Sequence, residues 1–402
     1  MVEETGNPWL TIVGIGEDGP AGLSAASLAA ITDAEWLTGA ARHLALLPDV
    51  RCDTAAWPVP FADGIAPLLA RRGRRVVMLV SGDPFWFGAG SVVARHIPSD
   101  EWIAHPAPST FALVAARLGW PLEDTRCLGL HAAPFARLRP DLAPGRRIVA
   151  TVRDGAAVAS LARYLDAAGF GDSDLWICEA LGGPSERLRR ARAATCDVAD
   201  IRHPVAVAIT VEGAGAILPA ASGRPDHWFA HDGQLTKRPV RALTLSALAP
   251  RRGELLWDIG AGSGSIGIEW LLADPANHAL AFEADPTRAA RARSNAEALG
   301  VERLQVIEGH APAVLANQPL PDAVFVGGGL SADLLEDLCG RLRSGARLVA
   351  NAVTLESEAL LAQWHAAKGG DLLRVEMAEA APLGTRRGWR AHYPIVQWSV
   401  TL

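Results

Sequence analysis

A glycine-rich turn and one acidic residue carry the strongest chemical signal in the chain. Residues 255–267 read Leu-Leu-Trp-Asp-Ile-Gly-Ala-Gly-Ser-Gly-Ser-Ile-Gly. Because Gly260, Gly262 and Gly264 have no Cβ atom, the backbone can bend sharply after an apolar run and approach a ligand closely. Glu283 ends the next apolar run, where a carboxylate can accept both hydroxyls of a ribose. The spacing predicts a site for a ligand that contains a nucleoside.

Two such ligands fit this pattern, a nicotinamide dinucleotide and S-adenosylmethionine. A dinucleotide site requires the pattern G-x-G-x-x-G, whereas here the glycines alternate and follow Asp258. This spacing favours S-adenosylmethionine. A dinucleotide-dependent oxidoreductase is the second hypothesis, and a methyltransferase acting on RNA or protein is the third, because one fold serves many acceptors.

The elements of the second half must place this turn at the end of a strand in a sheet. Apolar spacings of three and four predict a helix over Lys237–Leu248. Seven strand-like runs follow, and the last two lie too close together for a crossover helix, so they should pair antiparallel. The expected strands are Glu254–Ile259, Ala279–Glu283, Leu304–Glu308, Ala323–Val326, Ala346–Asn351, Leu372–Glu376 and Pro394–Val400. We expect five parallel strands finished by a hairpin, a Rossmann-like α/β fold.

The first half also alternates short apolar runs with amphipathic stretches, as in parallel α/β proteins. The expected strands are Leu10–Ile15, Arg75–Val80, Glu101–Ala104, Arg147–Val152, Asp174–Cys178 and Val205–Val211. A Gly/Pro/Ala/Ser-rich stretch follows. It predicts a domain at 1–211, a linker at 212–226 and a second domain at 227–402.

Polar loops follow several of the first-half strands. Gly14 and Gly16 lie at the end of one strand, Ser81, Gly82 and Asp83 at the end of another, and Ser109 and Thr110 where a helix should begin. Exposed amides and small side chains in such loops can surround a folded ligand. Asp83 can instead cap its own turn, and the aromatic run at 85–87 can either pack internally or face a flat substrate.

These loops, together with Leu128-Gly129-Leu130-His131 and the segment 179–187, resemble the tetrapyrrole (class III) methylases. The turn at 255–267 resembles the nucleotide-binding motif of class I S-adenosylmethionine-dependent methyltransferases. Its flanks at 231–238, 321–329 and 349–356 are similar to the decarboxylating precorrin-6B C5,15-methyltransferase family of cobalamin biosynthesis. The resemblance therefore covers nearly the whole chain and implies one S-adenosylmethionine in each domain.

The resemblance also implies site residues. Cofactor-binding positions carried over are Gly14, Gly16, Ser81, Gly82, Asp83, Ser109, Thr110, Gln234, Thr236, Asp258, Gly260, Ala261, Gly262, Ser263, Gly264, Glu283, Gly309, His310 and Gly327. Substrate-binding positions are Lys237, Arg238, Asn351 and Thr354. Arg241 near the first of these, and the cluster Arg386, Arg387 and Arg390, can either grip substrate carboxylates or lie on a solvated surface.

The activity implied is methylation of precorrin-6B at C5 by the first domain and at C15 by the second. The second domain would also remove carbon dioxide from the acetate on C12, giving precorrin-8. His231 and His310 are the candidate proton donors for that step. A cobalt-containing form of the substrate is the alternative acceptor.

Composition narrows the class of protein. The chain has 402 residues, a net charge of −6 and 38 basic residues, of which only Lys237 and Lys368 are lysines. This charge disfavours a nucleic-acid partner. Five cysteines without a C-x-x-C pair predict neither disulfides nor a metal site. Glu3 and Glu4 do not fit a secretory signal and no run is long enough to span a membrane, so we expect a cytoplasmic protein, a homo-oligomer and, by resemblance, a tetramer.

Overall fold

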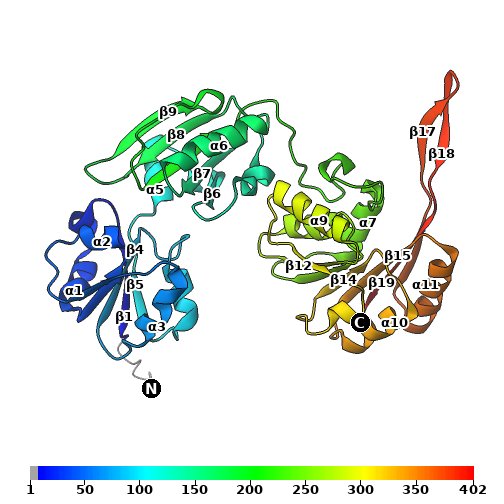
Figure 1. Cartoon of the computed structure of the whole chain (residues 1–402), viewed down its shortest axis with the longest axis horizontal. Coiled ribbons are helices and arrows are strands. Elements are labelled where there is room, and N and C mark those ends of the chain that lie inside the picture. Colours follow the sequence, from blue (N-terminus) through cyan, green and yellow to red (C-terminus); the bar gives the residue numbers. More distant parts are fainter. Residues whose placement is uncertain (1–7) are drawn as a thin grey trace. The chain divides into compact units, whose positions relative to one another are not determined.

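The computed structural model describes residues 8–402, which form two compact units (Figure 1). The first unit holds the described residues up to Ala133 together with Asp141–Ala216. The second holds Pro134–Pro140 and Ile217–Leu402, so the chain passes from one unit to the other at Ala216. Glu3 and Glu4, on which the signal-peptide expectation rests, lie outside the described residues.

The first unit begins with a wholly parallel sheet in the order β3-β2-β4-β1-β5. Its strands are β1 (Leu10–Ile15), β2 (Trp36–Gly39), β3 (Asp53–Ala56), β4 (Val76–Ser81) and β5 (Trp102–His105). The helices of this part are α1 (Ala25–Asp33), α2 (Ala41–Ala45), α3 (Ile65–Leu69) and α4 (Gly90–Val93). The central strand β4 is buried from Val76 to Val80, as expected for a strand covered on both faces.

A second, mixed sheet completes the first unit in the order β6-β7-β10-β8-β9. Its strands are β6 (Thr125–Gly129), β7 (Arg147–Val152), β8 (Asp174–Glu179), β9 (Arg187–Arg192) and β10 (Val205–Thr210). The accompanying helices are α5 (Thr110–Leu118) and α6 (Gly155–Ala167). Phe111 and Val114 of α5 share a buried cluster with residues of this sheet, so α5 leads directly from the first sheet to the second.

The second unit contains a seven-stranded sheet in the order β13-β12-β11-β14-β15-β19-β16. Its strands are β11 (Leu255–Ile259), β12 (His278–Glu283), β13 (Gln305–Glu308), β14 (Ala323–Val326), β15 (Arg347–Ala352), β16 (Asp371–Val375) and β19 (Ile395–Thr401). The helices are α7 (Arg238–Leu248), α8 (Ser265–Ala273), α9 (Pro286–Ala298), α10 (Ala332–Arg341) and α11 (Leu355–Lys368). Strand β19 is antiparallel to both β15 and β16, which confirms the predicted pairing of the last two sheet strands.

Successive residues of β11 point to opposite faces of this sheet. Leu256 joins one buried cluster with Trp270 of α8, and Trp257 joins the other with Leu334 of α10. Both faces are thus covered by helices. Ligands of such sheets bind outside the carboxyl ends of the strands, where the strand order reverses, and here that point lies between β11 and β14.

A two-stranded hairpin between β16 and β19 escaped the sequence prediction. It consists of β17 (Ala378–Leu383) and β18 (Arg386–Ala391), and Figure 1 shows it extending away from the sheet and helices of its unit. The arginine cluster expected before the last strand lies on β18. Four strands of the first unit were also not predicted, namely β2, β3, β6 and β9.

The remaining helical turns are short 3-10 segments: Gly19–Gly22, Phe61–Gly64, Ala94–His96, Leu122–Asp124, Phe135–Asp141, Ala193–Thr195, Asp226–Trp228 and Ala313–Leu315.

Candidate functional site

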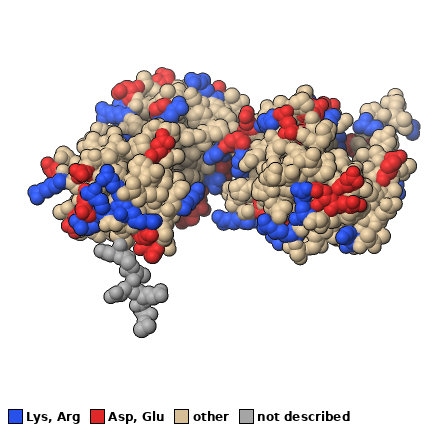
Figure 2. Space-filling model, turned by 60° about the horizontal axis from the view of Figure 1, so that its bottom comes forward, with Lys and Arg blue, Asp and Glu red and all other residues tan. Residues whose placement is uncertain are grey.

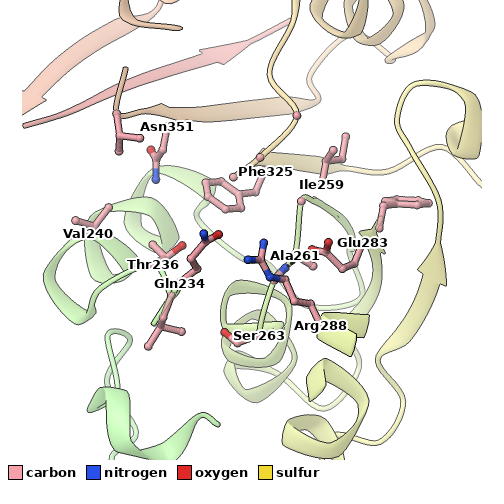
Figure 3. Close-up of a pocket in the computed structure, with 18 of the residues that line it drawn as sticks. Gln234, Thr236, Val240, Ile259, Ala261, Ser263, Glu283, Arg288, Phe325 and Asn351 are labelled. Carbon is pink, nitrogen blue, oxygen red and sulfur yellow. Dashed lines mark hydrogen bonds between the residues drawn. The ribbon is translucent and has the colours of Figure 1, made fainter. Parts of the chain in front are cut away.

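The second unit has a cavity of about 1020 Å³ at the carboxyl ends of its parallel strands. Many of the predicted site residues meet on its wall, although segments far apart in the sequence carry them (Figure 3). They are Gln234, Thr236, Lys237, Gly260, Ala261, Gly262, Ser263, Glu283, Gly309, His310, Gly327 and Asn351. We call this space the second-unit cavity.

The turn after β11 is possible only with glycine at Gly260. Its φ is +70°, and a Cβ atom there would lie 2.5 Å from the backbone nitrogen of Gly328. The turn after β11 and the loop after β14 therefore touch backbone to backbone. This contact brings both loops to the edge of the cavity, as the alternating glycines predicted.

Glu283 is fixed before any ligand arrives. One carboxylate oxygen accepts a hydrogen bond from the amide of Gly262 at 2.7 Å, and the other accepts one from the amide of Asp285 at 2.9 Å. The residue is 7% exposed, yet it lines the cavity beside Ala261 (Figure 3). A carboxylate held at the end of the second strand, facing a glycine turn, suits the ribose of S-adenosylmethionine, and the cavity has room for that molecule.

Asp258 lies beneath the turn rather than on the cavity wall. It is 1% exposed, and its Oδ2 accepts a hydrogen bond from the amide of Gly267 at 2.9 Å. Burial raises the pKa of Asp258 to about 7, and the nearby charge of Glu283 adds to this effect. Asp258 therefore organises the start of α8 and does not face the cavity.

The loop before α7 is tied to α9 through Asp232. Its Oδ1 accepts a hydrogen bond from the amide of Gln234 at 3.0 Å, while its Oδ2 pairs with Arg288 and Arg291 at 2.9 and 3.0 Å. These contacts, the Gln234 amide first, hold the pKa of Asp232 well below its usual range. The result is that Gln234 and Thr236 are held at the cavity (Figure 3).

Asn351 at the far side of the cavity is oriented by two polar neighbours. Its Nδ2 donates to Thr244 Oγ1 at 2.9 Å, and its Oδ1 accepts from Gln397 Nε2 at 2.9 Å. Gln397 Nε2 also lies 3.1 Å from Thr244 Oγ1. Three elements, α7, β15 and β19, thus fix the amide plane of a residue predicted to contact the substrate.

Several predicted residues lie away from the second-unit cavity. Gly264 starts α8 behind the turn, and the exposed His231 accepts a hydrogen bond on Nδ1 from the Gly233 amide. Arg238 donates from Nε to the Gly223 carbonyl at 2.8 Å, and Thr354 caps α11 by accepting from the Ser357 amide. Their side chains serve the local structure.

Arg241 corrects one expectation, because it is neither on a solvated surface nor free to grip a substrate. The side chain is fully buried and its Nε donates to Glu269 at 2.6 Å. Glu269 also accepts from the amides of Gly223 and Arg224. This buried pair attaches α7 and the entering chain to α8.

Several cavity residues were missed by the sequence reasoning, among them Arg288, Met377, His392 and Tyr393. Arg288 lies on α9, in a helix whose many arginines gave no reason to choose one. The other three flank the hairpin β17–β18, which was not predicted, so no element placed them near the glycine turn.

The first unit has its own cavity, of about 600 Å³, which we call the first-unit cavity. Predicted residues on its wall are Gly16, Ser81, Gly82, Asp83, Ser109 and Thr110. Gly14 lies behind it, where a Cβ atom would be 1.8 Å from the Gly82 carbonyl oxygen. Asp83 caps its own turn by accepting from the Phe85 amide at 2.8 Å, yet it also lines the cavity.

The aromatic run beside this cavity divides between the two roles considered for it. Trp86 and Phe87 line the first-unit cavity and are about half exposed, at 52% and 53%. Both also contact the ring of Phe111, with centroids 6.5 and 5.3 Å away. Phe85 is not part of the cavity wall and packs on Trp102, with ring centroids 5.3 Å apart. Two of the three rings are thus available to a flat ligand.

Ser81 is the centre of a polar network in the first-unit cavity. Its Oγ accepts a hydrogen bond from Arg42, which pairs with Glu17, and lies 3.2 Å from Nε2 of His43. His43 is 4% exposed. Burial, and then the charge of Arg42, lowers the pKa of His43 to about 3, so the imidazole is neutral at physiological pH. Sequence reasoning found Ser81 but not the three side chains that orient it.

The abundant arginines are largely used in ion pairs. Figure 2 shows basic and acidic side chains on the same visible face. Strand β9 is an example, because Arg187 and Arg189 pair with Glu179 while Arg190 pairs with Asp174. In the part of the chain that the structure describes, all five cysteines are free, no cluster suits a metal ion, and no helix could span a membrane.

Comparisons with known proteins find two family models in this chain. Family models described as "Tetrapyrrole (Corrin/Porphyrin) Methylases" and "Precorrin methyltransferase domain" match residues 9–197 and 227–402. A precorrin-6Y C(5,15)-methyltransferase [decarboxylating] from Sinorhizobium sp is 49% identical, covering 98% of this chain and 97% of its own.

Two further relatives correspond to part of the chain. A cobalt-precorrin-6B C(15)-methyltransferase (decarboxylating) from Salmonella typhimurium is 31% identical over 40% of this chain and 85% of its own. The crystal structure of the C-terminal domain of precorrin-6Y C5,15-methyltransferase from Rhodobacter capsulatus is 53% identical, covers 46% of this chain and all of that one, and has a TM-score of 0.45. Given the full-length match to the Sinorhizobium enzyme, the chain belongs to the family of decarboxylating precorrin-6Y C(5,15)-methyltransferases.

Proposed function

We propose that this protein transfers methyl groups to C5 and C15 of precorrin-6B and removes carbon dioxide from the acetate on C12, giving precorrin-8. The observation that carries this proposal is the presence of two separate cavities, each walled by glycine-rich loops at strand ends, in a chain that matches a decarboxylating C(5,15)-methyltransferase over nearly its whole length. A cobalt-containing form of the acceptor is the alternative.

S-adenosylmethionine supplies the methyl group in both cavities. In the second-unit cavity Glu283 would accept the ribose hydroxyls, while the amides around Gly260 and Gly309 and the polar side chains of Gln234 and Thr236 would surround the rest of the molecule. In the first-unit cavity the loops at Gly82 and Ser109 would do the same. The protein's task is to hold donor and acceptor in contact and exclude water, which needs no protein nucleophile.

We assign C5 methylation to the first unit, and C15 methylation with decarboxylation to the second. The name of the Salmonella relative includes C(15) methylation and decarboxylation only. The family model described as "Precorrin methyltransferase domain" matches residues 227–402, and we therefore place both of these activities in the second unit. Precorrins carry many carboxylates, which cationic side chains bind. Lys237 and Arg288 on the wall of the second-unit cavity suit that role, and Asn351 offers an oriented amide.

The hairpin β17–β18 supports the expected homo-oligomer. Leu383 and Trp389 are 70% and 80% exposed, and a two-stranded ribbon alone is marginally stable in water. A second copy covering these side chains would stabilise it.

Free cysteines throughout the described residues support a reducing, cytoplasmic location.

Two full-length variants test the division of labour. Glu283→Ala should lose C15 methylation and decarboxylation, and Thr110→Trp, which fills the first-unit cavity, should lose C5 methylation. Products formed from precorrin-6B and S-adenosylmethionine are read by mass spectrometry. Loss of both methylations in either variant would contradict the assignment, and binding of NADH without S-adenosylhomocysteine would favour an oxidoreductase instead.

A further inference from the structure

We propose that His392, held by Glu379, is the proton donor that completes decarboxylation in the second-unit cavity. This inference rests on the proposed function and adds a residue and an atom to it. Loss of carbon dioxide from an acetate side chain leaves an electron pair on the remaining carbon, and a proton must be delivered to that carbon.

The hairpin base brings His392 to the cavity. Its backbone amide donates to the Met377 carbonyl at 2.9 Å, directly beyond the last paired residues of β17 and β18, Ala378 and Ala391. Met377 and His392 both line the cavity. The segments that enter and leave the hairpin, at Met377 and His392, therefore form one wall of the cavity, and His392 is part of that wall.

Glu379 gives this ring an acidic neighbour. Its Oε2 lies 3.4 Å from Nε2 of His392 and 3.7 Å from the guanidinium of Arg390. Nε2 of His392 is buried away from solvent and has no other polar partner among the described residues. With Nε2 facing Glu379, Nδ1 is the ring nitrogen left to face a ligand in the cavity.

The other two histidines considered for this role are less suited to it. His231 is outside the cavity wall and its Nδ1 already accepts from the Gly233 amide. His310 lines the cavity, but no carboxylate within the described residues pairs with it. Among the histidines of residues 8–402, His392 alone combines a place on the cavity wall with an acidic partner.

The step balances without a further reactant. The bond between the acetate methylene carbon and its carboxylate breaks, carbon dioxide leaves, and the electron pair stays on the methylene carbon, where the conjugated ring delocalises it. The Nδ1–H of the His392 imidazolium then transfers its proton to that carbon, which becomes a methyl group. The imidazole is left neutral and takes a proton from water before the next turnover.

Chemical rescue in the full-length protein tests the proposal. His392→Ala should form decarboxylated product about 100-fold more slowly, within the range for loss of a general acid, while binding S-adenosylhomocysteine normally. Added imidazole should restore part of the rate. Glu379→Gln should also slow this step and Glu379→Asp should recover much of it. His278→Ala, at an exposed position outside the cavity, is the matched control. It should decarboxylate at the wild-type rate, and added imidazole should not alter that rate.

Two results would overturn the role of His392: an unchanged rate of decarboxylation in His392→Ala, or a loss that imidazole does not restore. If His392→Ala fails to bind S-adenosylhomocysteine, His392→Gln replaces it, and decarboxylation at the wild-type rate in that variant rejects the proposal. Failure of the wild-type protein to methylate precorrin-6B would instead reject the proposed function, so the two failures are distinguishable.

Discussion

The carboxylate of Glu283 and the amide of Gly262 are joined by a 2.7 Å hydrogen bond across the turn that follows β11. The residue predicted to bind the ribose therefore also stabilises the glycine turn that approaches the same ligand. Since Oε1 is held by the Asp285 amide, both carboxylate oxygens are positioned in advance, and little reorganisation is needed when a ligand binds.

Replacing Glu283 should weaken ligand binding in one cavity only. We expect Glu283→Ala to reduce the affinity of the second-unit cavity for S-adenosylhomocysteine by about 1–3 kcal/mol, the range for losing a charged hydrogen-bond partner. Isothermal titration calorimetry of the full chain should then resolve one weakened and one unchanged site. The control is Glu308→Ala, at the position paired with Glu283 on the next strand, where the carboxylate contacts only exposed Arg293. Equal effects of both changes would contradict the assigned role.

The buried carboxyl of Asp258 predicts a pH dependence of stability. Because burial raises its pKa to about 7, the folded state keeps a proton that the unfolded chain releases near pH 4. The free energy of unfolding should therefore fall as pH rises between these values and remain lower above about pH 7. Asp258→Asn cannot ionise, and its Oδ1 can still accept from Gly267.

The Tm of Asp258→Asn relative to the wild type should thus increase from about pH 5 to about pH 8. Scanning calorimetry of the ligand-free protein measures this difference. Asp371→Asn, at an exposed carboxyl, provides the comparison. A Tm difference for Asp258→Asn that does not change with pH would show that the carboxyl is ionised throughout.

The buried charges around Glu269 predict a large loss of stability when one partner is removed. Glu269→Ala removes the carboxylate that the buried Arg241 and Arg224 share and leaves Arg241 with Asp226 alone. Breaking such a buried pair typically costs about 3–5 kcal/mol. Urea denaturation followed through the second-unit transition should show this loss. Removing Glu376, which pairs with Arg374 on the surface at 3.3 Å, should cost at most about 1 kcal/mol. A double change of Arg241 and Glu269 to methionine should recover much of the stability, and failure to do so would show that the backbone contacts of Glu269 dominate.

The parallel core of both units was predictable because its strands are apolar runs between helical patterns. Strands β1, β7 and β14 begin and end at the residues expected. The missed strands are short or polar: β3 is mostly exposed, and β9 reads Arg-Leu-Arg-Arg-Ala-Arg. Such a segment is a strand because Glu179 and Asp174 pair with its arginines, a contact between elements that no local pattern reveals.

Some cavity residues were predictable from local sequence and others were not. Gly260 and Glu283 were identifiable from one strand-turn-helix motif, whereas His43 and His392 reach their cavities through elements distant from any motif. The prediction for Arg241 was wrong for a related reason: its buried partner Glu269 lies on another helix. Local sequence identifies backbone features, and the orientation of a polar side chain depends on tertiary partners.

The first unit should lose stability in mild acid because of His43. Burial, and then the charge of Arg42, lowers the pKa of His43 to about 3 in the folded state. In the unfolded chain the same ring takes up a proton below about pH 6.5. The contribution of the neutral His43 ring to the free energy of unfolding is complete above about pH 6.5. It is lost as pH falls toward 3, at up to about 1.4 kcal/mol per pH unit. His43→Gln, which does not titrate, should flatten the pH dependence of the first-unit transition in scanning calorimetry, whereas His96→Gln at an exposed position should not. An equally steep loss in the His43→Gln variant would assign the acid sensitivity to other groups.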